Sequence, residues 1–161
     1  MIITTKEFKK DKVPIIWPTL SLGRQWFDQR QYYVPTIKET KNRVVMNSVA
    51  GLPYNKDFLQ CESYALLLWG NIKRSLIDEA LQETAKHSLD LPDYLNNTWL
   101  FGFARGMNFS MGNAPEGVPH ALNFVYTTTG FWLIEPQKNR FWKPEKSNKK
   151  TDKDFVYYIT A

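Results

Sequence analysis

The chain has 161 residues, of which 43% are hydrophobic, and this length predicts one compact domain with a buried core over residues 1–161. Its single cysteine excludes an intramolecular disulfide, and no stretch approaches the run of about 18 apolar residues that a membrane span needs. The N-terminus also lacks the basic-then-apolar order of a signal peptide. We therefore expect a cytoplasmic protein with no membrane partner, and delivery by lysis or dedicated secretion stays open.

The net charge of +5 has two interpretations. Much of the excess lies in two lysine-rich segments, 6–12 and 143–153, which read as solvated terminal and loop segments. A basic surface would instead suit an anionic partner, such as nucleic acid or cell wall. Because these lysines do not share one helix face, we favour solubility over nucleic-acid binding.

Residues 1–50 predict an N-terminal arm and edge elements. Mixed polarity and two prolines predict an extended arm over 1–19, and residues 21–30 predict a short helix. Two β-branched and aromatic runs, 31–37 (QYYVPTI) and 43–49 (RVVMNSV), predict strands. We expect edge strands, because Pro35 cannot donate a hydrogen bond in a sheet interior.

A helix is predicted to begin near Cys61. Asp57, followed three residues later by Gln60, is a variant of the capping box that opens helices. Apolar residues then recur with the helical period, at Cys61, Ala65, Leu68 and Ile72, continuing toward Leu76, Ala80 and Leu81. Gly70 either permits close packing or marks a break.

The remainder predicts β-structure after a polar connection over 83–97. The predicted strands lie at 98–106, 118–127, 130–137, 138–142 and 154–160. The second and third form a hairpin around Thr128 and Thr129, and a Gly/Asn-rich loop at 107–117 precedes them. The expected class is α+β, with residues 51–161 forming an antiparallel sheet packed against a central helix that carries Cys61 at its N-terminus.

Three reactive side chains follow one another on these elements. Cys61 lies where helix amides and dipole favour the thiolate. His120 starts a strand beside the long loop, so it is a better proton acceptor than His87, which lies in a polar segment. With a two-residue turn, Glu135 and Gln137 share the face of His120, and Glu135 would orient the imidazole. A three-residue loop would reverse that parity.

Further candidates complete the predicted site. The oxyanion of acyl transfer needs donors about 3 Å away. Beside the Cys61 amide, the candidates for a second donor or an orienting group are Gln60, Asn55 and Gln137, and those for binding the substrate flanks are Trp99, Phe101 and Trp132. Each residue of the triad also has a structural interpretation: a core cysteine, a hydrogen-bonded structural histidine and a solvent-facing glutamate.

These motifs resemble a known family. Residues 61–65 (CESYA), 117–125 (GVPHALNFV) and 133–137 (LIEPQ) are similar to C-[DE]-x-[FY]-A, G-x-x-H-A-x-N-x-V and L-x-[EV]-P-Q in the papain-like cysteine-protease domain of a mushroom agglutinin and in small bacterial and phage proteins. The resemblance covers roughly residues 57–142. It implies a papain-like hydrolase with Cys61 as nucleophile, His120 as base and acid, and Glu135 as the orienting group.

The chain departs from that family beside the cysteine. In the agglutinin, activity is linked to calcium, and the pattern has aspartates around the cysteine. Here Gln60 precedes Cys61, and Glu62 and Ser63 follow it. Since calcium prefers several hard oxygen ligands, we predict no metal and no other cofactor.

Two functions from different classes follow. The first is a thiol hydrolase that cleaves a peptide or amide bond through an acyl-enzyme at Cys61, with a cell-wall amidase or endopeptidase as one form. The second is a catalytically inactive papain-like binding module of a phage or host-interaction protein, in which Cys61 is buried and inert. The sequence leaves the substrate and the oligomeric state open, and thiol reactivity discriminates between the two classes.

Overall fold

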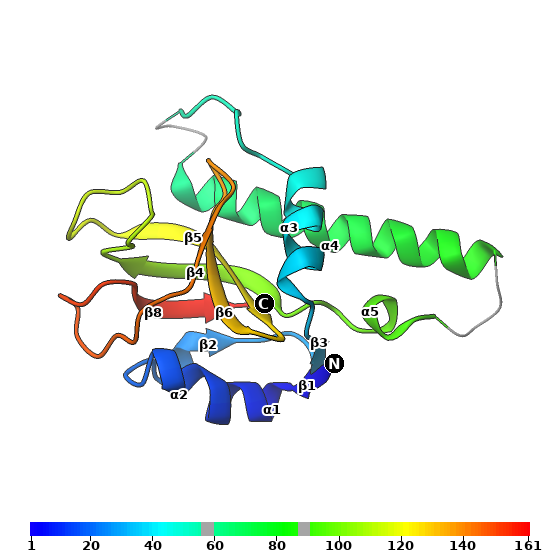
Figure 1. The fold of residues 1–161 in the computed structure, drawn as a ribbon, viewed down its shortest axis with the longest axis horizontal. Helices are drawn as coiled ribbons and strands as arrows, with labels where there is room; N and C mark the ends of the chain where they lie inside the picture. Colours follow the sequence, from blue (N-terminus) through cyan, green and yellow to red (C-terminus); the bar gives the residue numbers. More distant parts are fainter. Residues whose placement is uncertain (56–59, 87–90) are drawn as a thin grey trace.

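A six-stranded sheet organises the chain in the computed structural model, which describes residues 1–55, 60–86 and 91–161 (Figure 1). Its strands, in spatial order, are β2 (Gln25–Trp26), β8 (Phe155–Thr160), β4 (Phe101–Met107), β5 (His120–Thr127), β6 (Gly130–Glu135) and β7 (Arg140–Trp142). Neighbouring strands are antiparallel except β2 and β8, which are parallel. With one long helix beside this sheet, the expected α+β class is confirmed.

The long helix α4 (Cys61–Lys86) begins where the sequence predicted and continues through Gly70 without a break. Its buried side chains repeat with the helical period and comprise Tyr64, Ala65, Leu68, Ile72 and Leu76. The predicted cap Asp57 and the alternative His87 lie outside the described residues. Every helix in the described part of the chain is too short or too polar to cross a membrane.

Strand β5 is apolar on both faces. Val125 packs in a cluster with α4, whereas Leu122 and Phe124 pack in a second cluster with the N-terminal segment. In Figure 1, α4 and the N-terminal segment correspondingly lie on opposite sides of the sheet. A strand buried on both faces holds its neighbours in fixed register, which suits it to carry a site at its end.

The β5–β6 hairpin has the predicted two-residue turn. Thr127 pairs with Gly130, and Asn123 pairs with Ile134, so Thr128 and Thr129 form the connection. Because side chains alternate along each strand, this register gives His120 and Glu135 the same parity.

The N-terminal segment is helical, so the predicted extended arm over 1–19 is wrong. It contains β1 (Ile2–Thr4), α1 (Thr5–Glu7), the π-helical turn η1 (Phe8–Lys12) and α2 (Val13–Ile16). Thr4 and Glu7 form a reciprocal capping box that starts the helical run. Pro14 lies in the first turn of α2, where its missing N–H removes no helical hydrogen bond.

Two further predictions in this region need correction. Residues 21–30 form only a 3-10 turn, η2 (Leu22–Arg24), before β2, and Leu22 and Trp26 are exposed, so no apolar helix face exists. The predicted edge strand at 43–49 lies largely in helix α3 (Ile37–Met46), which begins at a second capping box, Thr36 with Glu39.

Two shorter elements agree with the sequence. The first predicted edge strand is present as β3 (Gln31–Tyr33), which pairs with β1 in a separate two-stranded sheet. The polar connection contains the short helix α5 (Asp93–Asn96). Neither element contributes a residue to the predicted triad.

Candidate active site

Cys61 is the first residue of α4, and its side chain is half-buried. The amide of Asn123 on β5 ties this end of the helix to the sheet: its Nδ2 donates to the carbonyls of Ala65 (2.8 Å) and Gly102 (3.1 Å). Ala65 is one helical turn beyond Cys61, so the bridge fixes the height of the thiol above the sheet.

His120 begins β5, and its side chain is 5% exposed. Its Nε2 lies 2.7 Å from Oε2 of Glu135, and the ring also interacts with the Cys61 thiol. Since Glu135 engages Nε2, the ring nitrogen that remains for the thiol is Nδ1. The Phe109 ring packs edge-on against the imidazole, with ring centroids 6.1 Å apart.

Glu135, the last residue of β6, is fully buried. Its Oε2 also accepts a hydrogen bond from the backbone N–H of Asn113 (3.0 Å), and its Oε1 accepts one from the N–H of Gln137 (3.4 Å). These donors offset the cost of removing a carboxylate from water. The structure thus brings the three predicted residues together in the order thiol, imidazole, carboxylate.

The pKa values of Cys61 and His120 are shifted in opposite directions. Burial alone would raise the pKa of Cys61, but hydrogen bonds from His120 and the Ala121 amide, with the charge of His120, outweigh it and lower that pKa. Burial alone would lower the pKa of His120, but hydrogen bonds and charges from Cys61 and Glu135 raise it to about 9. Both directions favour a thiolate beside an imidazolium at neutral pH.

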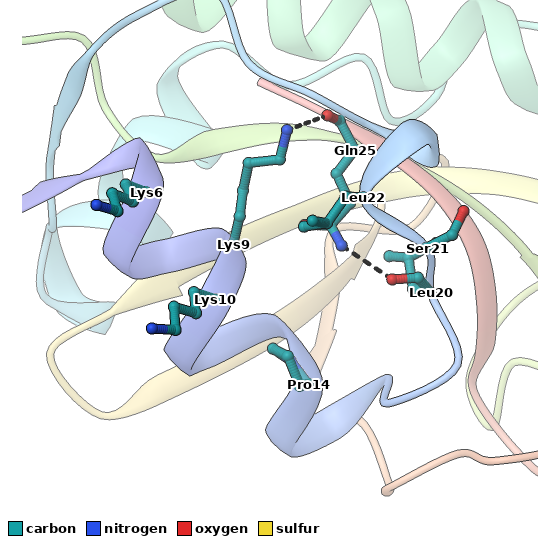
Figure 2. A pocket seen from close by; sticks show the side chains of 8 residues that line it. All are labelled: Lys6, Lys9, Lys10, Pro14, Leu20, Ser21, Leu22 and Gln25. Carbon is teal, nitrogen blue, oxygen red and sulfur yellow. Dashed lines mark hydrogen bonds between the residues drawn. The ribbon is translucent and has the colours of Figure 1, made fainter.

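A cavity of about 460 Å³ opens beside the thiol and the imidazole. Its lining residues are Tyr54, Cys61, Asn113, Ala114, Pro115, Val118, Pro119, His120, Gln137 and Lys138. A larger cavity of about 630 Å³ lies elsewhere, between the N-terminal helices and residues 20–25, and none of the three triad residues lines it (Figure 2). The smaller cavity is therefore the one where a substrate would meet Cys61.

Sequence reasoning missed the residues that close the loop at 107–117 over the imidazole. A Cβ on Gly112 would lie 2.9 Å from Cβ of Phe109 and 3.2 Å from Cδ2 of His120, so the close approach requires glycine. Asn113 donates its backbone N–H to Glu135 and its side-chain amide to Gln137. The Gly- and Asn-rich composition of this loop is the sequence feature that could have indicated these residues.

The buried carboxylate of Asp154 holds the loop at 107–117 by hydrogen bonds. Asp154 is fully buried and accepts hydrogen bonds from the N–H and Oγ of Ser110, the indole of Trp142 and the N–H of Glu145. These contacts join the loop to β7 and to the start of β8. No pattern in the sequence identified this residue.

Of the three predicted oxyanion or orienting candidates, one lines the Cys61 cavity and two are exposed. Gln137 lines the cavity. Gln60, immediately before α4, and Asn55 are exposed, and their positions do not identify either side chain as a donor to an oxyanion.

The predicted substrate-binding role of Trp99 and Phe101 is wrong. They are 3% and 1% exposed and pack in the core between α4 and the sheet, so they cannot contact a substrate. Trp132 is half-buried on β6, with the ammonium groups of Lys41 and Lys143 over its ring, and does not line the Cys61 cavity.

The described side chains beside Cys61 do not fit a calcium ion. Among the described residues, no group of three or more His, Cys, Asp or Glu side chains lies close enough together to hold a metal. Glu62 is the carboxylate next to Cys61, and it faces Arg105 at 3.9 Å. A single carboxylate opposite a cation lacks the set of oxygen ligands that calcium takes.

Comparison with known proteins shows similarity in fold only. No family model and no curated protein matches the sequence significantly. The chain is similar to a solved structure described as the PSL1a-E64 complex, with a TM-score of 0.64 and 12% identity over 99% of this chain and 51% of that one. It is also similar to Polyporus squamosus lectin bound to the human-type influenza-binding epitope Neu5Aca2-6Galb1-4GlcNAc, with a TM-score of 0.52 and 13% identity over 86% of this chain and 42% of that one. This chain thus spans about half the length of the first and less of the second.

Proposed function

We propose that the chain is a papain-like thiol hydrolase that cleaves a peptide or amide bond. The observation that carries this proposal is the arrangement of Cys61, His120 and Glu135, in which the imidazole lies between thiol and carboxylate and the first two residues line one cavity. Cytoplasmic location and single-domain organisation stay predictions.

The first half-reaction begins from the Cys61 thiolate and the protonated His120. Sγ attacks the carbonyl carbon of the scissile bond, a C–S bond forms, and the carbonyl oxygen takes the negative charge. The backbone amides at the start of α4, that of Cys61 among them, stabilise this oxyanion. His120 then gives its proton to the nitrogen as the C–N bond breaks, and the amine leaves.

The second half-reaction returns the enzyme to its starting state. His120, now neutral, accepts a proton from water, and the resulting hydroxide attacks the thioester carbon. The C–S bond breaks, the acid product leaves, and the thiolate again faces an imidazolium. Throughout, Glu135 fixes the ring orientation, because its carboxylate is itself held by Asn113 and Gln137.

Labelling of the folded protein with iodoacetamide, coupled to hydrolysis of a mixed peptide library, tests the proposal. The wild-type chain should label at Cys61 at neutral pH and cleave peptides, and Cys61→Ala should do neither while keeping its melting temperature. The matched variant Cys61→Ser keeps the size of the group but lacks the nucleophilic sulfur. A thiol that reacts only after denaturation contradicts the proposal and favours an inactive binding module.

A further inference from the structure

Another cavity lies beside Glu62, the residue that follows Cys61, and is bounded by β4 and β8. It measures about 410 Å³ and is lined by Arg24, Glu62, Phe103, Arg105, Tyr157, Tyr158 and Thr160. Glu62 directly follows Cys61 in α4, and Phe103 and Tyr158 belong to the same packed cluster as Cys61. The cavity therefore lies one residue along α4 from the proposed nucleophile.

The floor and one wall of this cavity come from a single sheet face. Phe103 pairs with Thr160, and Arg105 pairs with Tyr158, so all four side chains point to the face that α4 covers. The rings of Phe103 and Tyr158 meet edge-on, with centroids 6.2 Å apart. The sheet thus supplies a rigid apolar surface, and an arginine lies at its rim.

The rim of the cavity carries excess positive charge. Arg24 and Arg105 contribute two guanidinium groups, whereas Glu62 contributes one carboxylate. Arg105 Nη1 lies 3.9 Å from Oε2 of Glu62, and both side chains are 47% exposed. That separation is too long for a hydrogen bond, so the guanidinium keeps its donors for another acceptor.

We infer that this cavity, here called the arginine subsite, receives an acidic side chain of the substrate next to the scissile bond. The inference rests on the proposed function. A guanidinium fork matches a carboxylate in a bidentate manner, and the aromatic floor contacts the methylene groups that carry it. The substrate class is accordingly a peptide with Asp or Glu adjacent to the cleaved bond.

Two affinity probes that differ by one charge test the subsite in the full chain. Chloroacetyl-glutamic acid amide and chloroacetyl-glutamine amide share size and reactive group. In either, the Cys61 sulfur attacks the chloromethyl carbon, the C–S bond forms, and chloride leaves with the C–Cl electrons. We expect the glutamate probe to label Cys61 about fivefold faster, as a partly exposed charge pair allows, and the preference to fall in high salt.

Three variants assign the preference to the subsite. Arg105→Gln should abolish the preference, so that the glutamate probe labels Cys61 no faster than the glutamine probe does. Arg74→Gln is the matched control, since Arg74 lies on α4 away from the cavity with its side chain 83% exposed. Glu62→Gln should increase the preference, because it removes the competing carboxylate, and a folding defect would not produce a gain.

The outcomes separate the subsite from the proposed function. Equal labelling by both probes, at a rate well above that of a free thiol, would overturn the subsite and leave the hydrolase intact. If neither probe labels the folded protein, both the hydrolase and the subsite would be overturned. A preference for the glutamate probe that survives Arg105→Gln would also overturn the subsite. The same holds for a preference that is lost in the control Arg74→Gln.

Discussion

His120 Nε2 and Glu135 Oε2 lie 2.7 Å apart, and their side chains are 5% and 0% exposed. The two residues are 15 positions apart in the chain, and the hairpin register brings them to one face. Because both side chains are buried, the Glu135 carboxylate determines both the orientation and the protonation of the His120 ring.

Replacing Glu135 with Gln should lower kcat by about 100-fold or more, because the imidazolium loses its partner and the ring its fixed tautomer. The apparent pKa of Cys61 alkylation should rise at the same time, since a less basic His120 stabilises the thiolate less. Peptide hydrolysis and the pH profile of iodoacetamide labelling measure the two effects. The control is Glu116→Gln, an exposed carboxylate of the neighbouring loop. An unchanged pH profile in Glu135→Gln would contradict the assigned role.

The reactivity of the thiol should depend on pH with two limbs. Since the pKa of Cys61 is lowered, the alkylation rate should reach half its plateau below the free-thiol value of about 8.5. Hydrolysis needs the imidazolium proton as well, so it should decline as pH rises through about 9, the raised pKa of His120. Stopped-flow alkylation and kcat measured across this range test both limbs. A single limb centred on the free-thiol value would show that Cys61 and His120 are not coupled.

Gly112→Ala should slow Cys61 alkylation and hydrolysis by about tenfold or more, because small displacements of catalytic groups are costly. The added methyl group would lie 3.2 Å from the imidazole and 2.9 Å from Phe109, so the loop or the ring must shift. Gly23→Ala is the matched control, since its methyl group would meet nothing within 4 Å. Equal activities of the two variants would show that the loop does not position the ring.

Gly70→Ala should stabilise the protein by about 1 kcal/mol, the difference in helix propensity between the two residues. Gly70 lies inside α4, and a Cβ there would meet nothing within 4 Å. Urea unfolding of wild type and variant measures the change, and thiol labelling should stay the same. A loss of stability would contradict this prediction and would indicate that other residues of the protein pack closely against Gly70.

The elements around the triad were accessible from sequence because their signals are periodic and local. The spacing of Ala65, Leu68 and Ile72 predicted α4 and its buried face, and all three are buried. The Thr128 and Thr129 turn predicted the hairpin register. By contrast, the capping boxes at Thr4 and Thr36 were overlooked, and the segments that follow them are helical rather than extended.

The sequence alone determined that the central helix begins at Cys61, and that Glu135 shares a face with His120 if the intervening turn has two residues. These properties depend on helical period, strand alternation and turn length, which are set by near neighbours along the chain. The tertiary structure alone decided that the thiol meets the imidazole, that Gly112 lies against the ring while Asn113 holds Glu135, and that Trp99 and Phe101 belong to the core. Such contacts join residues from separate elements, and they depend on how whole faces pack, which no local pattern specifies.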